Sequence, residues 1–354
     1  MKTTELLSAL VIALAMIQSP DSQAQAPAAW QDHGGALVSD PSCAAFGAGE
    51  VVCAAVGAGG TLIVNRFDGA IWTGFENLGG IAVRKPSCTR WGIFLVACAV
   101  IDTQSRVQMN IFNGSTWSGF QLVGGQSVSE PACVGTAFIG SFATYCAIIG
   151  VNGALQVNRF DGTRWSGFQS LGGSYIYNPT CTQDWTFAGV FCAAVTIGAQ
   201  LEGWKNATGA SWVKMPQAVG TQVTADPNCA GIGAANGQGK ILCAVRSGTR
   251  LKVNRADDVS AWPLLTDLGG ILMAAPGCMP NSNPFLPTTT AVCAVRDTSS
   301  AVQMITFNGS TWSGFQLVPG VSVVGAPSCI FFGQTQKLCA VRGVNNRFYT
   351  RMIS

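Results

Sequence analysis

Charged side chains are scarce in this sequence. Asp, Glu, Lys and Arg make up 10% of its 354 residues, against about 25% in typical globular proteins. The formal net charge is only +3, and the basic residues are scattered along the chain without forming a cluster. Proteins that bind nucleic acid through its phosphates need such a cluster, so we expect no nucleic-acid partner.

Histidine is almost absent, and this restricts catalysis. His33 is the single histidine, and a histidine base needs a nucleophile and a carboxylate arranged around it. Propeller glycosidases instead use paired carboxylates or a tyrosine nucleophile, but the acidic residues of this chain lie mostly at turns. We predict no enzyme activity, no catalytic residue and no cofactor, and we interpret His33 as a turn or surface residue. The acidic turn residues are Asp68, Asp161, Asp257, Asp258 and Asp267.

Long apolar runs are also missing, except near the N-terminus. There Lys2 precedes an apolar stretch from Leu6 to Ile17, which is shorter than the ~18 residues that a membrane-spanning helix needs. Ser22 and Ala24 follow in the small-x-small pattern of a cleavage site. We predict a signal peptide over residues 1–24 and one domain over residues 25–354, secreted or periplasmic, with no membrane span. An uncleaved membrane anchor is the alternative.

Cysteines, in contrast, are numerous and regularly placed. The 14 cysteines form seven pairs, in which Pro-x precedes the first member and alanine follows the second. A signal peptide and an even cysteine count indicate disulfides, and partners on adjacent strands of one hairpin are within reach of each other. Zinc sites favour Cys-x2-4-Cys spacing with further ligands, so we expect no metal. The predicted disulfides are Cys43–Cys53, Cys88–Cys98, Cys133–Cys146, Cys181–Cys192, Cys229–Cys243, Cys278–Cys293 and Cys329–Cys339.

The cysteine pairs mark a repeat, because the first cysteines of successive pairs are 45 to 51 residues apart. Each repeat contains a Pro-x-Cys segment, a Cys-Ala segment, an apolar run such as Leu62–Phe67 and a segment that begins with tryptophan, such as Trp72–Phe75. Asp-Gly or Asn-Gly, which are strong hairpin signals, often separate the last two. Four short strands at this period are typical of a propeller blade. We predict an all-β, seven-bladed β-propeller with four antiparallel strands and one disulfide per blade.

The ends of the chain indicate how the ring closes. The seventh repeat stops before its tryptophan strand, whereas Trp30–Gly35 is a strand of that kind with no repeat before it. We predict that this N-terminal strand completes the last blade. The pairing would leave no open strand edge at which chains could aggregate.

The best-formed repeats carry a family resemblance. Leu155–Gly173, Leu62–Gly80 and Val107–Gly125 are variants of Leu-x-x-x-Arg-Phe-Asp-Gly-x-x-Trp-Ser-Gly-Phe-x-x-Leu-Gly-Gly, followed by Pro-x-Cys. This unit resembles the repeat of the PLL-type lectins, the family named from the Photorhabdus luminescens lectin, over the whole mature chain. The resemblance implies a seven-bladed propeller that binds fucose or O-methylated sugars.

Sugar binding has simple chemical requirements. A pyranose presents an apolar C–H face and several hydroxyls, so a site needs an aromatic plate and a few amide or guanidinium groups. Three repeats carry Asn-Arg shortly before their tryptophan, and one repeat keeps only the asparagine. We predict that these side chains line grooves between blades. The predicted carbohydrate-binding residues are Asn65, Arg66, Trp72, Asn110, Trp117, Asn158, Arg159, Trp165, Asn254, Arg255 and Trp262.

A structural interpretation competes with this one. A tryptophan repeated in every blade is often the wedge that packs blade on blade, and Asn-Arg pairs are often plain polar residues of a sheet edge. Two functions therefore stay open. The first is a multivalent lectin whose partners are glycans or glycoconjugates, and the second is a non-catalytic protein-interaction or surface-structural propeller. Homo-oligomers are compatible with both.

Overall fold

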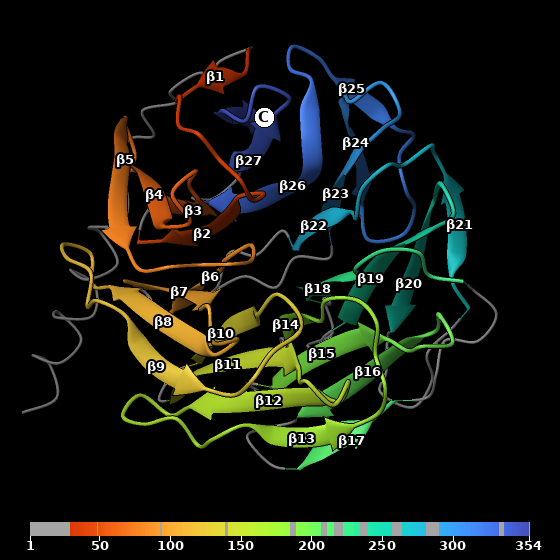
Figure 1. Ribbon diagram of the computed structural model, residues 1–354. Helices are drawn as coiled ribbons and strands as arrows, with labels where there is room; N and C mark the ends of the chain where they lie inside the picture. Colours follow the sequence, from red (N-terminus) through yellow and green to blue (C-terminus); the bar gives the residue numbers. More distant parts are fainter. Residues whose placement is uncertain are drawn as a thin grey trace, which may run out of the picture.

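The computed structural model describes residues 29–353 except positions 48, 93, 139–140, 185–188, 207–210, 216–221, 234–239, 257–263, 281–289 and 333–335. The predicted signal peptide and Trp262 lie outside the described residues. Seven four-stranded antiparallel sheets are arranged as blades around a central axis (Figure 1), which confirms the predicted seven-bladed propeller. In the described residues no helix has the length and apolar character to cross a membrane.

Blades 1 to 6 run outward from the axis in chain order, whereas the outer strand of blade 7 is the N-terminal β1. Blade 1 contains β2 (Ser42–Phe46), β3 (Glu50–Val56), β4 (Leu62–Phe67) and β5 (Trp72–Gly79). Blade 2 contains β6 (Ser87–Trp91), β7 (Leu95–Ile101), β8 (Val107–Phe112) and β9 (Gln121–Gly124). Blade 3 contains β10 (Ala132–Phe138), β11 (Ser141–Ile149), β12 (Leu155–Phe160) and β13 (Gln169–Gly172). Blade 4 contains β14 (Thr180–Asp184), β15 (Gly189–Val195), β16 (Leu201–Asn206) and β17 (Trp212–Lys214).

The remaining blades follow the same plan. Blade 5 contains β18 (Asn228–Ile232), β19 (Lys240–Ser247), β20 (Arg250–Ala256) and β21 (Thr266–Gly269). Blade 6 contains β22 (Gly277–Pro280), β23 (Ala291–Arg296), β24 (Val302–Phe307) and β25 (Gln316–Val318). Blade 7 contains β26 (Val323–Phe332), β27 (Gln336–Gly343), β28 (Phe348–Ile353) and β1 (Gln31–Asp32).

The burial of each strand follows its place in the blade. In the second strand, β3, every residue after Glu50 is buried, because both faces of a blade are covered by its neighbours. Small and β-branched residues such as Val, Ala and Cys fit this position. The third strand combines buried and half-buried residues, as β4 does, and the residues of the outer strand β5 are half-buried or exposed. The core consequently lies between the blades.

The ring closes as predicted. β1 pairs antiparallel with β28, in the register Gln31 with Thr350 and Asp32 with Tyr349. The first strands of consecutive blades also contact one another around the whole ring, including β26 against β2. Both ends of the described chain therefore lie in the same blade.

All seven predicted disulfides form, each between the first two strands of one blade. Cys43 and Cys53, for example, face each other in register, with Cα atoms 4.1 Å apart. The described residues include no free cysteine. Closing a loop of this length contributes about 3 kcal/mol in the chain-entropy model, so each blade has a covalent brace next to the axis.

Hydrogen bonds also join the blades beside these disulfides. The side chain that precedes the first cysteine of one blade accepts a bond from the backbone N–H of the first cysteine in the next blade, as Ser42 Oγ does from Cys88 at 2.9 Å. This fixes the height of each first strand relative to its neighbour. The bond is present for Ser42–Cys88, Ser87–Cys133, Thr180–Cys229, Asn228–Cys278 and Ser328–Cys43.

Candidate functional site

The asparagines of the predicted site lie inside the blades. Asn65 pairs across the sheet with Cys53 and is 0% exposed. Asn110, Asn158 and Asn254 occupy the same position and are 1%, 0% and 2% exposed. Contrary to the expectation from sequence, these amides therefore lie beside the disulfides and not on a surface that a sugar can reach.

The arginines point away from these asparagines. Successive residues of a strand face opposite sides of the sheet, and Phe67 packs in the cluster between blades 7 and 1, so Asn65 faces that way too. Arg66 turns toward blade 2, where its Cζ atom lies 4.8 Å from the centroid of the Phe112 ring. The side chain of Arg66 is half-buried. Its guanidinium has no hydrogen-bond or ion-pair partner among the described residues.

Each described tryptophan of the outer strands packs against the preceding blade. The Trp117 ring lies 5.2 Å from the Phe112 ring, so it adjoins the same aromatic side chain on which Arg66 stacks. Trp72 instead lies 4.9 Å from the His33 ring, between blades 7 and 1. The structure therefore separates Arg66 from Trp72, with which the sequence analysis grouped it, and brings it to a junction with Trp117.

The junction of blades 5 and 6 repeats this arrangement. The Arg255 Cζ atom lies 5.4 Å from the centroid of Phe307, and Trp312 lies 5.2 Å from the same ring. Arg255 also donates a hydrogen bond to the carbonyl oxygen of Gly309 at 3.2 Å. The guanidinium is thus held flat against blade 6.

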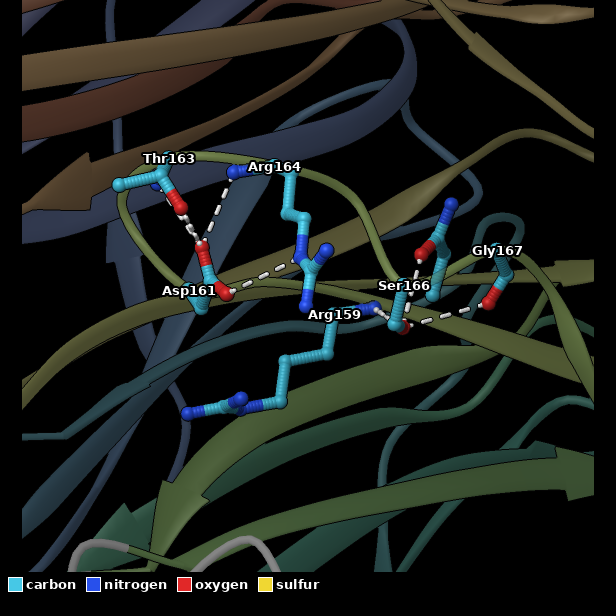
Figure 2. A network of polar contacts seen from close by, with 7 residues as sticks. Arg159, Asp161, Thr163, Arg164, Ser166 and Gly167 are labelled. Atoms are coloured by element: carbon cyan, nitrogen blue, oxygen red, sulfur yellow. Dashed lines mark hydrogen bonds and ion pairs between the residues drawn. The ribbon is translucent and has the colours of Figure 1, made fainter.

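A third arginine lies between blades 3 and 4. Arg159 Nε donates to the hydroxyl of Tyr145 at 3.1 Å, and Tyr145 lies 6.2 Å from Trp212. Figure 2 shows the Arg159 side chain extending away from the neighbouring hairpin turn. We call these three places the arginine junctions. They are Arg66 with Phe112 and Trp117, Arg159 with Tyr145 and Trp212, and Arg255 with Phe307 and Trp312.

Other junctions carry a different residue at the arginine position. Ile111 packs with Trp165 between blades 2 and 3, and Met352 packs with Trp72 between blades 7 and 1. Lys205 holds the position in blade 4, but its Nζ atom pairs with Asp184 at 2.6 Å. Trp72 and Trp165 consequently belong to apolar junctions.

The acidic hairpin turns have a structural role. Asp161 Oδ1 accepts hydrogen bonds from the backbone N–H groups of Thr163 and Arg164 at 2.8 and 2.9 Å (Figure 2). The bond from the Arg164 N–H, together with those from the Thr163 hydroxyl and N–H, holds the pKa of Asp161 well below its usual range. A carboxylate fixed in this way stays ionised and caps its turn. The equivalent turn residues are Asp68, Asn113 and Asn308.

His33 belongs to the ring closure. Its Nε2 atom lies 2.6 Å from Thr350 Oγ1, and its backbone N–H donates to Phe348 at 2.9 Å. Burial lowers the pKa of His33. The His33 ring packs against Trp72 and Phe348, and its burial there favours the neutral form.

A cavity of about 450 Å³ lies along the axis, bounded by the first strands of the blades. At one end it is lined by the residues that precede the prolines of the Pro-x-Cys segments. Burial raises the pKa of Glu130 to about 7; Lys85 opposes this rise, and Asp226 and Asp40 add to it. No group of three or more His, Cys, Asp or Glu side chains in the described residues is placed to hold a metal ion. The polar side chains of this end are Asp40, Lys85, Glu130, Asn178 and Asp226.

Sequence reasoning missed the aromatic partners of the arginines. Phe112 and Phe307 are the last residues of the third strands of their blades. The arginine of the preceding blade stacks on each ring. The repeated Arg-Phe pair was visible in the sequence, but only the blade order shows that an arginine meets the next phenylalanine along the ring. The axial cavity was missed because no local pattern marks it.

No protein-family model and no curated protein sequence matches this chain, so the resemblance to PLL-type lectins stays a prediction. Solved structures are similar in fold. The BP39L lectin from Burkholderia pseudomallei is 13% identical, with a TM-score of 0.73 over 91% of this chain and 96% of that chain. AofleA from Arthrobotrys oligospora is 13% identical, with a TM-score of 0.58 over 82% and 90%. The fucose-specific lectin from Aleuria aurantia is 14% identical, with a TM-score of 0.57 over 81% and 97%. At these identities the likeness shows that the chain shares the propeller fold of known lectins.

Proposed function

We propose that this chain is a secreted, non-catalytic lectin that binds carbohydrate at its arginine junctions. The observation that carries the proposal is Arg66, which stacks on Phe112 at 4.8 Å while its guanidinium donors have no partner among the described residues. A guanidinium offers five N–H donors in a fixed fork. Such a fork can donate to two adjacent sugar hydroxyls while a neighbouring aromatic ring contacts the C–H face.

Fucose is the sugar to test first. The solved lectins of similar fold include one described as fucose-specific and one described in complex with α-methyl fucoside. O-methylated sugars are the second class, from the resemblance of the repeat. Three arginine junctions would make the protein multivalent, and repeated weak sites raise avidity. Seven disulfides fit an oxidising compartment, which supports secretion or periplasmic export.

The test compares two arginines on an array of immobilised fucosides and O-methyl sugars. Arg66→Ala should weaken monovalent fucose binding at its site by about 10- to 150-fold, because a hydrogen bond from a charged donor is lost. Arg164→Ala is the matched control, since Arg164 is an exposed arginine at a hairpin turn and should bind as wild type. Wild-type affinity in a folded Arg66→Ala, Arg159→Ala, Arg255→Ala protein would remove these junctions from the site.

A second candidate function is a protein-interaction propeller, and one observation favours it. Large apolar residues at the same place in five blades, where the chain crosses from one blade to the next, are about half exposed. Exposed apolar clusters often mark contact surfaces. If the protein binds none of the sugars on the array, that result would favour this function. The residues are Val38 at 55%, Val83 at 52%, Val128 at 48%, Ile176 at 50% and Met273 at 47% exposed.

A further inference from the structure

One face of the propeller gathers exposed apolar side chains. The strands of a blade alternate in direction, so the segments that join one blade to the next lie on the same face as the turns between second and third strands. We call this the crossing face. Its joining segments are residues 33–41, 80–86, 125–131, 173–179, 222–227, 270–276 and 319–322, and its turns are residues 57–61, 102–106, 150–154, 196–200, 248–249, 297–301 and 344–347. Besides the five apolar residues of the blade crossings, this face carries five apolar side chains that are more than half exposed, namely Ile81, Val151, Ile197, Ile271 and Val344.

The opposite face has fewer such side chains. Among the described residues at its hairpin turns, the large exposed apolar ones are Ile71, Phe94 and Phe142. The blades repeat one another around the axis, so equivalent positions lie at about one height along it. The apolar side chains of the crossing face therefore form a broad, flat ring. An exposed apolar surface of this extent marks a site of contact with a protein or a membrane.

The acidic side chains of the crossing face are mostly engaged within the protein. Asp40 pairs with Arg342 at 3.4 Å, and Asp102 pairs with Arg106 at 2.9 Å. Two other carboxylates accept hydrogen bonds from side-chain amides; they are Asp226, from Asn178 at 2.8 Å, and Asp297, from Gln303 at 2.6 Å. Burial raises the pKa of Glu130 to about 7, so at neutral pH this carboxyl carries only part of a charge.

Four basic side chains of the crossing face have no carboxylate partner among the described residues. Arg84 and Lys85 lie in the segment that enters blade 2, where neither side chain forms a hydrogen bond or an ion pair within the described part of the chain. Arg246 and Arg296 lie near the ends of second strands in blades 5 and 6. Their Nη2 atoms donate to backbone carbonyl oxygens of the joining segments at 2.9 and 3.2 Å, which holds each guanidinium at this face without neutralising it.

These observations define the chemistry of the partner, which must cover aliphatic side chains and supply negative charge. A second copy of the chain would bring the same uncompensated positive charge to the interface, and like charges repel. The flat ring suits a planar surface. Apolar and basic side chains also meet directly, because a hollow of about 350 Å³ on this face has Val38, Val83, Arg84 and Lys85 among its lining residues.

We propose that the crossing face docks on a membrane surface that contains anionic phospholipid. The aliphatic side chains would enter the boundary between headgroups and acyl chains, while Arg84, Lys85, Arg246 and Arg296 contact lipid phosphates. The third strands run from this face to the opposite one, so Arg66, near the far end of β4, lies away from the membrane. The docked protein would therefore keep its arginine junctions accessible.

The experiment measures co-sedimentation of the full chain with vesicles of phosphatidylglycerol and phosphatidylcholine in equal parts, and with vesicles of phosphatidylcholine alone. The wild type should bind the anionic vesicles more tightly. Raising NaCl from about 0.1 M to about 1 M shortens the Debye length from about 10 Å to about 3 Å and should weaken that binding. Arg84→Gln should weaken it about fivefold, and Arg84→Gln combined with Lys85→Gln about 25-fold, because each basic residue near an anionic surface contributes a similar increment.

Matched controls on the opposite face separate the docking surface from general effects of charge and hydrophobicity. Arg164 is an exposed arginine at the β12–β13 turn, so Arg164→Gln makes the same change in net charge and should bind vesicles as wild type does. For the apolar contribution, Ile197→Ser should weaken binding by up to about tenfold. Ile71→Ser should not, although Ile71 is 65% exposed and Ile197 is 72% exposed.

Three results would overturn the proposal. The first is no binding of the wild type to anionic vesicles, which would leave an acidic protein as the partner of this face. The second is wild-type binding by both the Arg84→Gln, Lys85→Gln protein and Ile197→Ser. The third is an equal loss in Arg164→Gln and Ile71→Ser. The vesicles carry no sugar and fucose binding should be unchanged in Arg84→Gln, so this proposal and the proposed lectin function fail independently.

Discussion

The second glycine of each Gly-Gly turn lies against an aromatic ring of the next blade. A Cβ atom on Gly80 would lie 2.6 Å from the Phe120 ring, and one on Gly35 would lie 2.7 Å from Phe75. The same contact recurs between Gly125 and Phe168 and between Gly270 and Phe315. These rings therefore pack on bare backbone, and the glycine lets two blades approach closely at their outer edges.

Substitution of two neighbouring glycines distinguishes the effect of this packing contact from that of backbone strain. Gly79 and Gly80 have φ of +73° and +68°, where alanine costs roughly 1–2 kcal/mol. A Cβ atom on Gly79 would meet nothing within 4 Å. Gly80→Ala should therefore lower the free energy of unfolding by about 1–3 kcal/mol more than Gly79→Ala does, from overpacking against Phe120. Urea unfolding of both variants measures the difference, and equal losses would contradict a packing role for Gly80.

Individual site residues were harder to predict than the fold. Asn65 and Arg66 are adjacent, and the two-residue period of a strand already implies that they face opposite blades. The prediction that both side chains line one groove disregards this period. The partners Phe112 and Trp117, in contrast, come from the next repeat, so their position depends on how whole blades pack. Trp262 lies outside the described residues, and its assignment stays a prediction.

At the scale of the strand, the blades are joined near the axis by single hydrogen bonds from side chain to backbone. Ser87 Oγ accepts the N–H of Cys133 at 2.9 Å, and Cys133 is buried. Blade 3 has Ala132 and blade 6 has Gly277 at the position of this serine, and neither side chain can form the bond. Adjacent first strands are therefore linked unevenly around the ring.

The Ser87→Ala variant tests how much one such hydrogen bond contributes to the free energy of unfolding. Removing the hydroxyl leaves the buried N–H of Cys133 without an acceptor, which should lower the free energy of unfolding by about 1–3 kcal/mol. Ser115→Ala is the matched control, because Ser115 is an exposed serine in a hairpin turn and its side chain makes no hydrogen bond to another blade among the described residues. A surface change of that kind should stay within about 0.5 kcal/mol. Indistinguishable denaturation curves for the two variants would show that the link contributes nothing.

Strand boundaries were predicted well for the inner strands and less well for the outer one. The Pro-x-Cys and Cys-Ala segments became first and second strands in every blade. In blades 2, 3 and 6 the outer strand begins only after the tryptophan, which forms a single bridge such as that of Trp117 with Phe112. Gly119, with φ of +77°, interrupts the strand there. Inner strands are constrained on both faces by neighbouring blades, whereas the outer strand has solvent beside it.

For the whole molecule, the blade number could be predicted because it depends only on counting. Each repeat carries its own cysteine pair, and Trp30–Gly35 supplies the missing outer strand of the seventh. The axial cavity could not be predicted in the same way. Its lining residues come from the first strands of all seven blades, and only the closed ring brings them together.

Few residues close the ring. β1 contains only Gln31 and Asp32, and Arg347 Nε pairs with the Asp32 carboxylate at 2.9 Å on the surface. Trp30 packs against the cluster between blades 6 and 7. An exposed ion pair contributes at most about 1 kcal/mol, whereas truncation of a buried tryptophan costs about 3–5 kcal/mol. We therefore expect the partly buried ring of Trp30 to contribute more to closure than the charges do.

Deletion of Trp30–Gly35 tests this closure directly. Loss of β1 exposes the backbone of β28 as an open edge, so the free energy of unfolding should fall by several kcal/mol, led by the tryptophan. Hydrogen exchange at Thr350 and its neighbours on β28 should accelerate, while β27, which keeps its partner β26, should be affected less. Arg347→Ala is the control, because it removes only the surface ion pair. A deletion variant with the melting temperature and β28 exchange rates of Arg347→Ala would mean that the N-terminal strand does not hold the ring together.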